Sequence, residues 1–161
     1  MFNSSDVFLL LKIKEAGYSD TVTIGVYIFY NLVYAFTAYP LGMLADRIGL
    51  KKILIFGLVV FAAVYAGMAL NLDLYIFFAL FFLYGIYAAS MEGVAKAWIT
   101  NIADRKDTAT AIGTFTGLQS ISTMLASSIA GLLWFNFGAV VSFAATAVAT
   151  MFVVVYFLLL K

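Results

Sequence analysis

Charged residues are few along the chain, and they divide it into long apolar runs. Residues 21–45 carry no charge, residues 53–72 carry none, and none occurs from position 108 to position 160. A helix needs roughly 20 apolar residues to cross the hydrocarbon core of a bilayer, so each run is long enough to span it. The pattern therefore predicts membrane-spanning helices, and the single proline in the chain is typical of a helical bundle.

Five full spans follow from the positions at which polar residues interrupt the runs. The last uncharged run is too long for one helix, and the segment Trp134-Phe135-Asn136-Phe137-Gly138 is where we expect it to break. The predicted spans cover residues 21–45, 51–70, 73–102, 108–133 and 139–160. The last of these has little polar content, which favours a lipid-facing helix at the periphery.

Residues 1–15 are expected to be the end of a further helix. The segment before Lys12 reaches about 16 Å at a rise of 1.5 Å per residue, roughly half of a hydrocarbon core. Asp6 interrupts its apolar run and no basic segment precedes it, so we expect no secretory signal. The predicted fold is an all-α membrane protein, a transmembrane bundle of five full spans plus a truncated first helix.

Composition supports a membrane protein and limits its chemistry. The chain is 65% hydrophobic and 11% charged, whereas a soluble domain has about 25% charged residues. It has no Cys and no His, so we expect no disulfide, no metal site and no cofactor. A net charge of +1 gives no indication of a nucleic-acid partner. No nucleophile–base pair or phosphate-binding loop is found, so we do not expect an enzyme.

One polar island, residues 42–52, separates the first two full spans. Gly42 and Gly49 suit a tight turn, because Gly tolerates the backbone conformation that ends a helix. In this topology the basic residues at positions 47, 51, 52, 105, 106 and 161 lie on one side of the membrane, and those at 12 and 14 lie on the other. The positive-inside rule therefore predicts a multi-pass protein of the inner (plasma) membrane with a cytoplasmic C-terminus.

This island resembles the signature loop of the major facilitator superfamily of transporters, Gly-x-Leu-Ala-Asp-Arg-x-Gly-x-basic-basic. Its named positions are filled by Gly42, Leu44, Ala45, Asp46, Arg47, Gly49, Lys51 and Lys52. The resemblance implies a twelve-helix transporter, and the chain is similar to the carboxy-terminal six-helix half of a bacterial member. It also implies movement of a small-molecule substrate by alternating access, with the missing amino-terminal half or a second copy as partner.

The sequence also indicates an internal repeat. Residues 42–49 align with residues 131–138, and Gly, Leu and Gly coincide at three positions. The offset, 131 minus 42, is 89 residues, and three helices separate the two copies, so the second copy is inverted in the membrane. Inverted three-helix repeats are typical of transporter halves. We therefore expect one domain, residues 1–161, with repeat 1 at about 1–71 and repeat 2 at about 72–161.

Acidic residues inside apolar segments are candidates for function, because a charge in the hydrocarbon core costs at least ~2.5–3.5 kcal/mol. Asp6, together with Asn3, is interpreted either as a proton or substrate site that faces a cavity or as a polar patch solvated near a chain end. Glu92 and Lys96 have the i, i+4 spacing of a helix ion pair. That spacing favours a structural or gating role for them over contact with substrate.

Uncharged polar residues and the signature loop complete the candidate site. Asn31, Tyr34 and Gln119 either line a central cavity or form hydrogen bonds between helices. Within the loop, we expect Asp46 to accept hydrogen bonds from the start of the 108–133 span.

We also expect Arg47 to pair with Glu92.

Two functions stay open: a secondary transporter, present here as a partial chain, or a non-transporting half-bundle that assembles with a partner or with itself in the bilayer.

Overall fold

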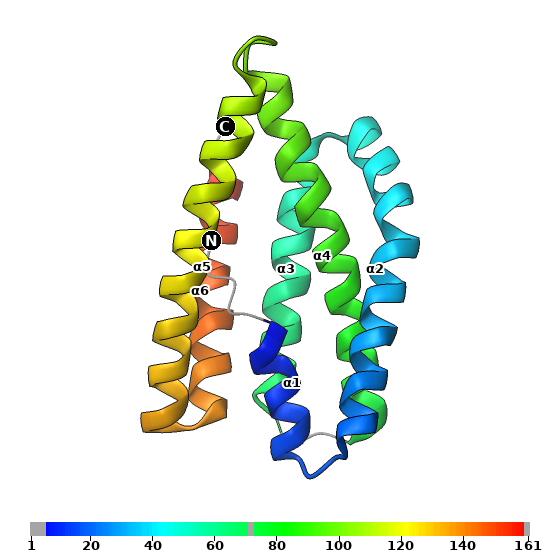
Figure 1. Ribbon diagram of the computed structural model, residues 1–161, viewed down its shortest axis with the longest axis vertical. Coiled ribbons are helices and arrows are strands. Elements are labelled where there is room, and N and C mark those ends of the chain that lie inside the picture. Colours follow the sequence, from blue (N-terminus) through cyan, green and yellow to red (C-terminus); the bar gives the residue numbers. More distant parts are fainter. Residues whose placement is uncertain (1–5, 71–72, 160–161) are drawn as a thin grey trace.

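The computed structural model describes residues 6–70 and 73–159, and these form six α-helices with no strand among them (Figure 1). The helices are α1 (Asp6–Glu15), α2 (Asp20–Ile48), α3 (Leu50–Met68), α4 (Leu74–Ile102), α5 (Thr108–Phe137) and α6 (Ala139–Leu159). Those from α2 to α6 are long and apolar enough to cross a membrane. The predicted all-α bundle, with five spans after a short first helix, is confirmed.

The helices run alternately up and down, so the turns between them gather at two ends of the bundle (Figure 1). The α2–α3 and α4–α5 turns lie together at the top of the view, with the C-terminal end of α6. We call this the basic end, after its basic residues Arg47, Lys51, Lys52, Arg105 and Lys106.

The two lysines that the sequence places on the opposite side lie in α1, close to the α1–α2 turn. Lys12 pairs with Glu15 at 3.3 Å, and Lys14 pairs with Asp20 at 2.8 Å. Because acidic partners balance both lysines, the excess of positive charge is confined to the basic end.

The turn between α2 and α3 is tighter than the sequence suggests. Only Gly49 separates the two helices, and its φ of 99° is a conformation that favours glycine. Asp46 and Arg47 lie in the last turn of α2, and Lys51 lies in the first turn of α3. The expectation of a charged loop is therefore corrected: the signature residues are carried by two helix ends.

The turn between α5 and α6 repeats this geometry. Gly138 alone separates the two helices, with φ of 85°, and its N–H donates to the Trp134 carbonyl as the N–H of Gly49 donates to that of Ala45. Both pairs of residues are separated by the offset of 89, since 138 minus 49 and 134 minus 45 give the same number. The inverted repeat itself stays a prediction. The turn at Gly138 corrects the expected end of the fifth span from residue 133 to Phe137.

The core forms where α4 packs along α2 and α3 and where α3 packs along α6. Buried aromatic side chains of α3 and α4, among them Phe61, Tyr65, Phe81 and Tyr84, fill it. At Gly85 the backbone of α4 approaches α2 so closely that an added Cβ would lie 2.9 Å from the Val33 Cβ. Small residues are common where membrane helices approach each other closely.

Small residues recur at every fourth position along α4, at Gly85, Ala89, Gly93 and Ala97, and only part of this stripe makes such a contact. Gly85 and Ala89 are buried, whereas Gly93 is exposed and has nothing within 4 Å of the position that a Cβ would take. The contact between α2 and α4 is therefore close at Gly85 and open at Gly93.

The α5 and α6 helices lie side by side at one edge of the bundle (Figure 1). On α6, buried residues such as Phe143 and Ala147 face α3, and exposed apolar residues such as Phe152 cover the outside. The lipid-facing character predicted for α6 agrees with this arrangement. On α5 only Ala126 and Ala130 are buried among the described residues, so α5 is more exposed than α6, which the sequence does not indicate.

Candidate functional site

A cavity of about 680 Å³ lies among α1, α2, α4 and α5. Its lining includes Asp6 of α1, Tyr30 of α2, seven residues of α4 between Tyr84 and Lys96, and six residues of α5 between Phe115 and Met124. Among the described residues, α3 and α6 contribute none of the lining. The described cavity thus lies among α1, α2, α4 and α5, while α3 packs against α4 and α6.

Asp6 lies against two tyrosine hydroxyls from neighbouring helices. Tyr84 donates a hydrogen bond to Oδ1 of Asp6 at 2.5 Å, and Tyr30 donates a longer one to Oδ2 at 3.5 Å. Tyr30 and Tyr84 each lie ten residues from the start of their helices, about 15 Å along the axis at 1.5 Å per residue. Asp6 therefore lies well inside the depth of the bilayer. Of the two interpretations of Asp6 that the sequence left open, the one in which it faces a cavity fits these surroundings.

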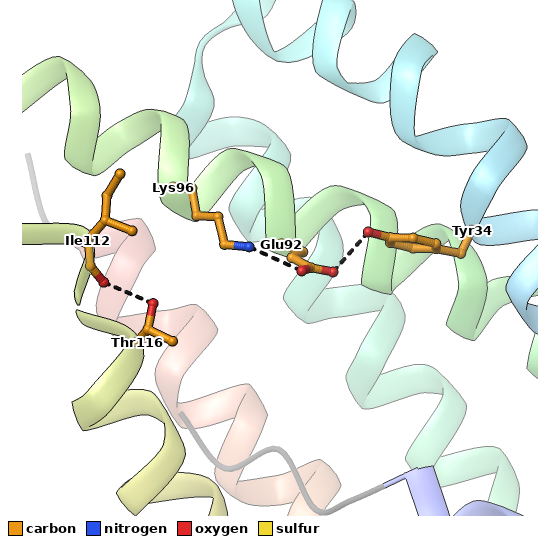
Figure 2. Close-up of polar contacts among 5 residues, drawn as sticks. All are labelled: Tyr34, Glu92, Lys96, Ile112 and Thr116. Atoms are coloured by element: carbon orange, nitrogen blue, oxygen red, sulfur yellow. Dashed lines mark hydrogen bonds and ion pairs between the residues drawn. The ribbon is translucent and has the colours of Figure 1, made fainter. Parts of the chain in front are cut away.

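A second polar group links α2 to α4 along the same cavity. Figure 2 shows Glu92 between Tyr34 and Lys96. The Tyr34 hydroxyl donates to Oε2 of Glu92 at 2.8 Å, and the Lys96 ammonium donates to Oε1 at 3.2 Å. The predicted helix ion pair between Glu92 and Lys96 is therefore present, and Tyr34 extends it to α2.

The predicted pair between Arg47 and Glu92 is wrong. Arg47 lies 13 residues beyond Tyr34 on α2, about 20 Å farther along the axis, whereas Tyr34 is the residue that reaches Glu92. Across the described part of the chain, Arg47 forms no ion pair, and the expected hydrogen bonds from the start of α5 to Asp46 are also absent. The roles of Gly42, Asp46, Gly49, Lys51 and Lys52 in gating stay predictions.

The other cavity candidates divide between those that line it and those that do not. Gln119 lines the cavity. Asn31 is not among the lining residues, and its amide group donates to the Tyr27 carbonyl of its own helix at 2.8 Å. Asn3 lies outside the described residues.

Sequence reasoning missed most of the α4 and α5 lining. On α5, the residues Thr116, Gln119, Ser120 and Thr123 follow an i, i+3, i+4, i+7 pattern. That spacing places them on one helix face. A polar stripe of this period in a membrane helix is a signal that could have identified the cavity wall. On α4, Tyr87 was missed because aromatic side chains are also common in cores, where they pack.

The bundle and its cavity define an α-helical multi-pass membrane protein with a polar, solute-sized space between its helices. The sequence profile of the Major Facilitator Superfamily matches residues 2–161, and the chain belongs to this family of transporters. This confirms the family that the signature loop predicts; the bacterial origin stays a prediction.

One relative is a protein of Methanocaldococcus jannaschii described as "Uncharacterized MFS-type transporter MJ1317". The chain is 35% identical to it over 138 residues, which cover 82% of this chain and 35% of the relative. The chain therefore spans about a third of that relative's length. No solved structure matches the chain.

Proposed function

We propose that the chain is the carboxy-terminal half of a secondary transporter that moves a small solute by alternating access. The observation that carries this proposal is the cavity of about 680 Å³ with the Asp6 carboxylate well inside the bilayer depth. Solute sites of such transporters lie within the membrane between helical repeats. Acidic residues at that depth are costly and generally have a functional role.

The same proposal assigns the four cavity helices to one wall of a larger site. Exposed polar residues of α5, such as Gln119 and Ser120, face the cavity without being covered by another helix. An amino-terminal half, or a second copy of the chain, would form the opposite wall. Rocking of one half against the other about the solute would then expose the site to each side in turn.

We further propose that the basic end faces the cytoplasm, with the C-terminus on that side and the protein in the inner (plasma) membrane. The two turns at that end, together with the helix ends beside them, carry five basic residues, Arg47, Lys51, Lys52, Arg105 and Lys106. At the opposite end, the nearby lysines of α1 are paired with acids. An excess of Lys and Arg on short turns is the feature that orients a membrane protein.

The absence of cysteine allows a direct test of the cavity. Gln119→Cys places a thiol in the cavity, and Ile121→Cys, two residues away on an apolar and exposed position of the same helix, is the matched control. We expect a membrane-impermeant maleimide to label Gln119→Cys in proteoliposomes and to leave Ile121→Cys unlabelled, because only the first faces water. Equal labelling of the two variants would contradict a water-filled cavity at this position.

A further inference from the structure

The described cavity lining carries one negative charge that no cation balances. Its charged residues are Asp6, Glu92 and Lys96. Lys96 is paired with Glu92 at 3.2 Å, whereas the partners of Asp6 are two neutral phenols. A carboxylate held in this way within the membrane is complementary to a positive charge on a ligand.

The groups around Asp6 present hydrogen-bond acceptors and aromatic rings. Because the Tyr30 and Tyr84 hydroxyls use their protons on Asp6, their oxygen lone pairs stay available as acceptors. The ring centroids of Tyr30 and Tyr84 are 5.2 Å apart, and those of Tyr84 and Tyr87 are 5.5 Å apart. Tyr84 and Tyr87 are buried, with 1% and 7% of their surface exposed, so the half-buried Tyr30 is the ring of the three that a ligand can contact. Aromatic rings attract organic cations electrostatically.

The α5 wall of the cavity is uncharged and combines apolar with polar side chains. Phe115 and Met124 give it apolar surface, and Thr116, Gln119 and Ser120 give it uncharged polar groups. No described lining residue of α5 is basic. An anion would therefore face Asp6 without a free cationic partner, and a divalent metal ion would find one carboxylate where it prefers several.

We propose that the Asp6 site binds an organic monocation, with the ammonium group at the Asp6 carboxylate and the apolar part between Tyr30 and the α5 wall. This inference rests on the proposed function, because it names the solute class of the same cavity. Asp6 supplies the charge, Tyr30 and Tyr84 hold its carboxylate in place, and the buried Tyr87 ring packs against Tyr84.

Equilibrium binding to the purified 161-residue chain tests the proposal without requiring transport. Three probes of similar size differ in charge: benzyltrimethylammonium, benzyl alcohol and phenylmethanesulfonate. We expect saturable binding of the cation alone, measured by isothermal titration calorimetry. Asp6→Asn should weaken that binding at least about ten-fold, because it removes the charge and keeps the shape. Asp73→Asn, an acidic residue at the start of α4 and outside the cavity, is the matched control and should bind as the unmodified chain does.

Tyr84→Phe gives a second readout that does not change charge. It removes a hydroxyl that holds Asp6, and we expect it to weaken cation binding several-fold while the sulfonate stays unbound. Circular dichroism and the size-exclusion profile of each variant show whether the bundle is folded. If Asp6→Asn is not folded, Tyr84→Phe carries the test.

Several results would overturn the proposal: no saturable binding of the cation, equal binding of the three probes, or unchanged cation binding in folded Asp6→Asn. Its failure is distinct from failure of the proposed function. Transport of a neutral or anionic solute that is insensitive to Asp6→Asn would remove the cation inference alone. Cation binding without any flux in a complete two-half assembly would remove the transport proposal and leave the binding site.

Discussion

The close approach of α2 and α4 at Gly85 couples the packing of the bundle to its cavity. In Gly85→Ala, the new Cβ would lie 2.9 Å from both Cβ and Cγ1 of Val33 and 3.0 Å from the Tyr30 carbonyl oxygen. Carbon atoms in good contact are about 3.5–4.0 Å apart, so the two helices must separate by roughly 0.5–1 Å. Because a backbone atom is among the contacts, a change of side-chain rotamer alone cannot relieve the overlap.

The expected effect on stability is the difference between two opposing contributions. Overpacking costs about 1–3 kcal/mol, and replacing Gly by Ala within a helix returns about 0.8–1.0 kcal/mol. We expect a net loss of about 0–2 kcal/mol, which lowers the midpoint of thermal unfolding by up to about 8 °C in a chain of this size. Tyr30 also moves with α2, so its 3.5 Å hydrogen bond to Asp6 should break.

Gly93→Ala is the matched control for this change. It lies on the same helix, eight residues away, and no atom lies within 4 Å of its added Cβ. We expect this variant to be as stable as the unmodified chain or more stable by up to about 1 kcal/mol. Unfolding followed by the fluorescence of Trp98 and Trp134 measures both variants in detergent. Equal midpoints for the two variants would refute the packing argument.

Three further predictions concern the polar groups at and beyond the cavity. Tyr34→Phe removes the hydroxyl that joins α2 to Glu92 and should lower the free energy of unfolding by about 1 kcal/mol in the same assay. Tyr39, an exposed tyrosine of the same helix, provides the control, and Tyr39→Phe should have no effect. Equal losses in the two variants would contradict a role for the hydrogen bond. Asp46→Asn should cut solute flux in a complete two-half assembly without changing membrane insertion, and unchanged flux would argue against a role of the signature residues in gating. In intact cells, Leu50→Cys and Lys106→Cys at the basic end should resist an impermeant thiol reagent and Asn136→Cys should react; labelling of Leu50→Cys from outside would reverse the proposed orientation.

The spans could be predicted from the sequence because the bilayer imposes a length and a polarity on each helix. The uncharged run before Asp46 and the one after Lys52 predict α2 and α3 to within a few residues. The expected turn was too wide because charged residues were assigned to a loop. Helix ends at the membrane surface accept charged side chains, so one glycine with positive φ is sufficient to reverse the chain.

Contacts between helices were less predictable, because they depend on the rotation and level of each helix. Asp6 and Tyr84 are 78 residues apart in the chain, and no local pattern relates them. Asn31 illustrates the opposite case: a polar residue in a membrane helix can satisfy its amide group on its own backbone, and therefore need not face a cavity. Glu92 and Lys96 were predictable as a pair because their spacing along one helix determines their contact.

Solute uptake into proteoliposomes tests the central claim most directly, that this cavity is one wall of a transport site. The 161-residue chain is reconstituted alone and together with a six-helix amino-terminal half, and uptake from a pool of cationic, neutral and anionic solutes is read by mass spectrometry. We predict saturable uptake in the two-half assembly, its loss in Gln119→Trp, which fills the cavity, and no uptake by the chain alone. Uptake that is unchanged by Gln119→Trp, or that is absent from an assembled pair of halves, would contradict the account.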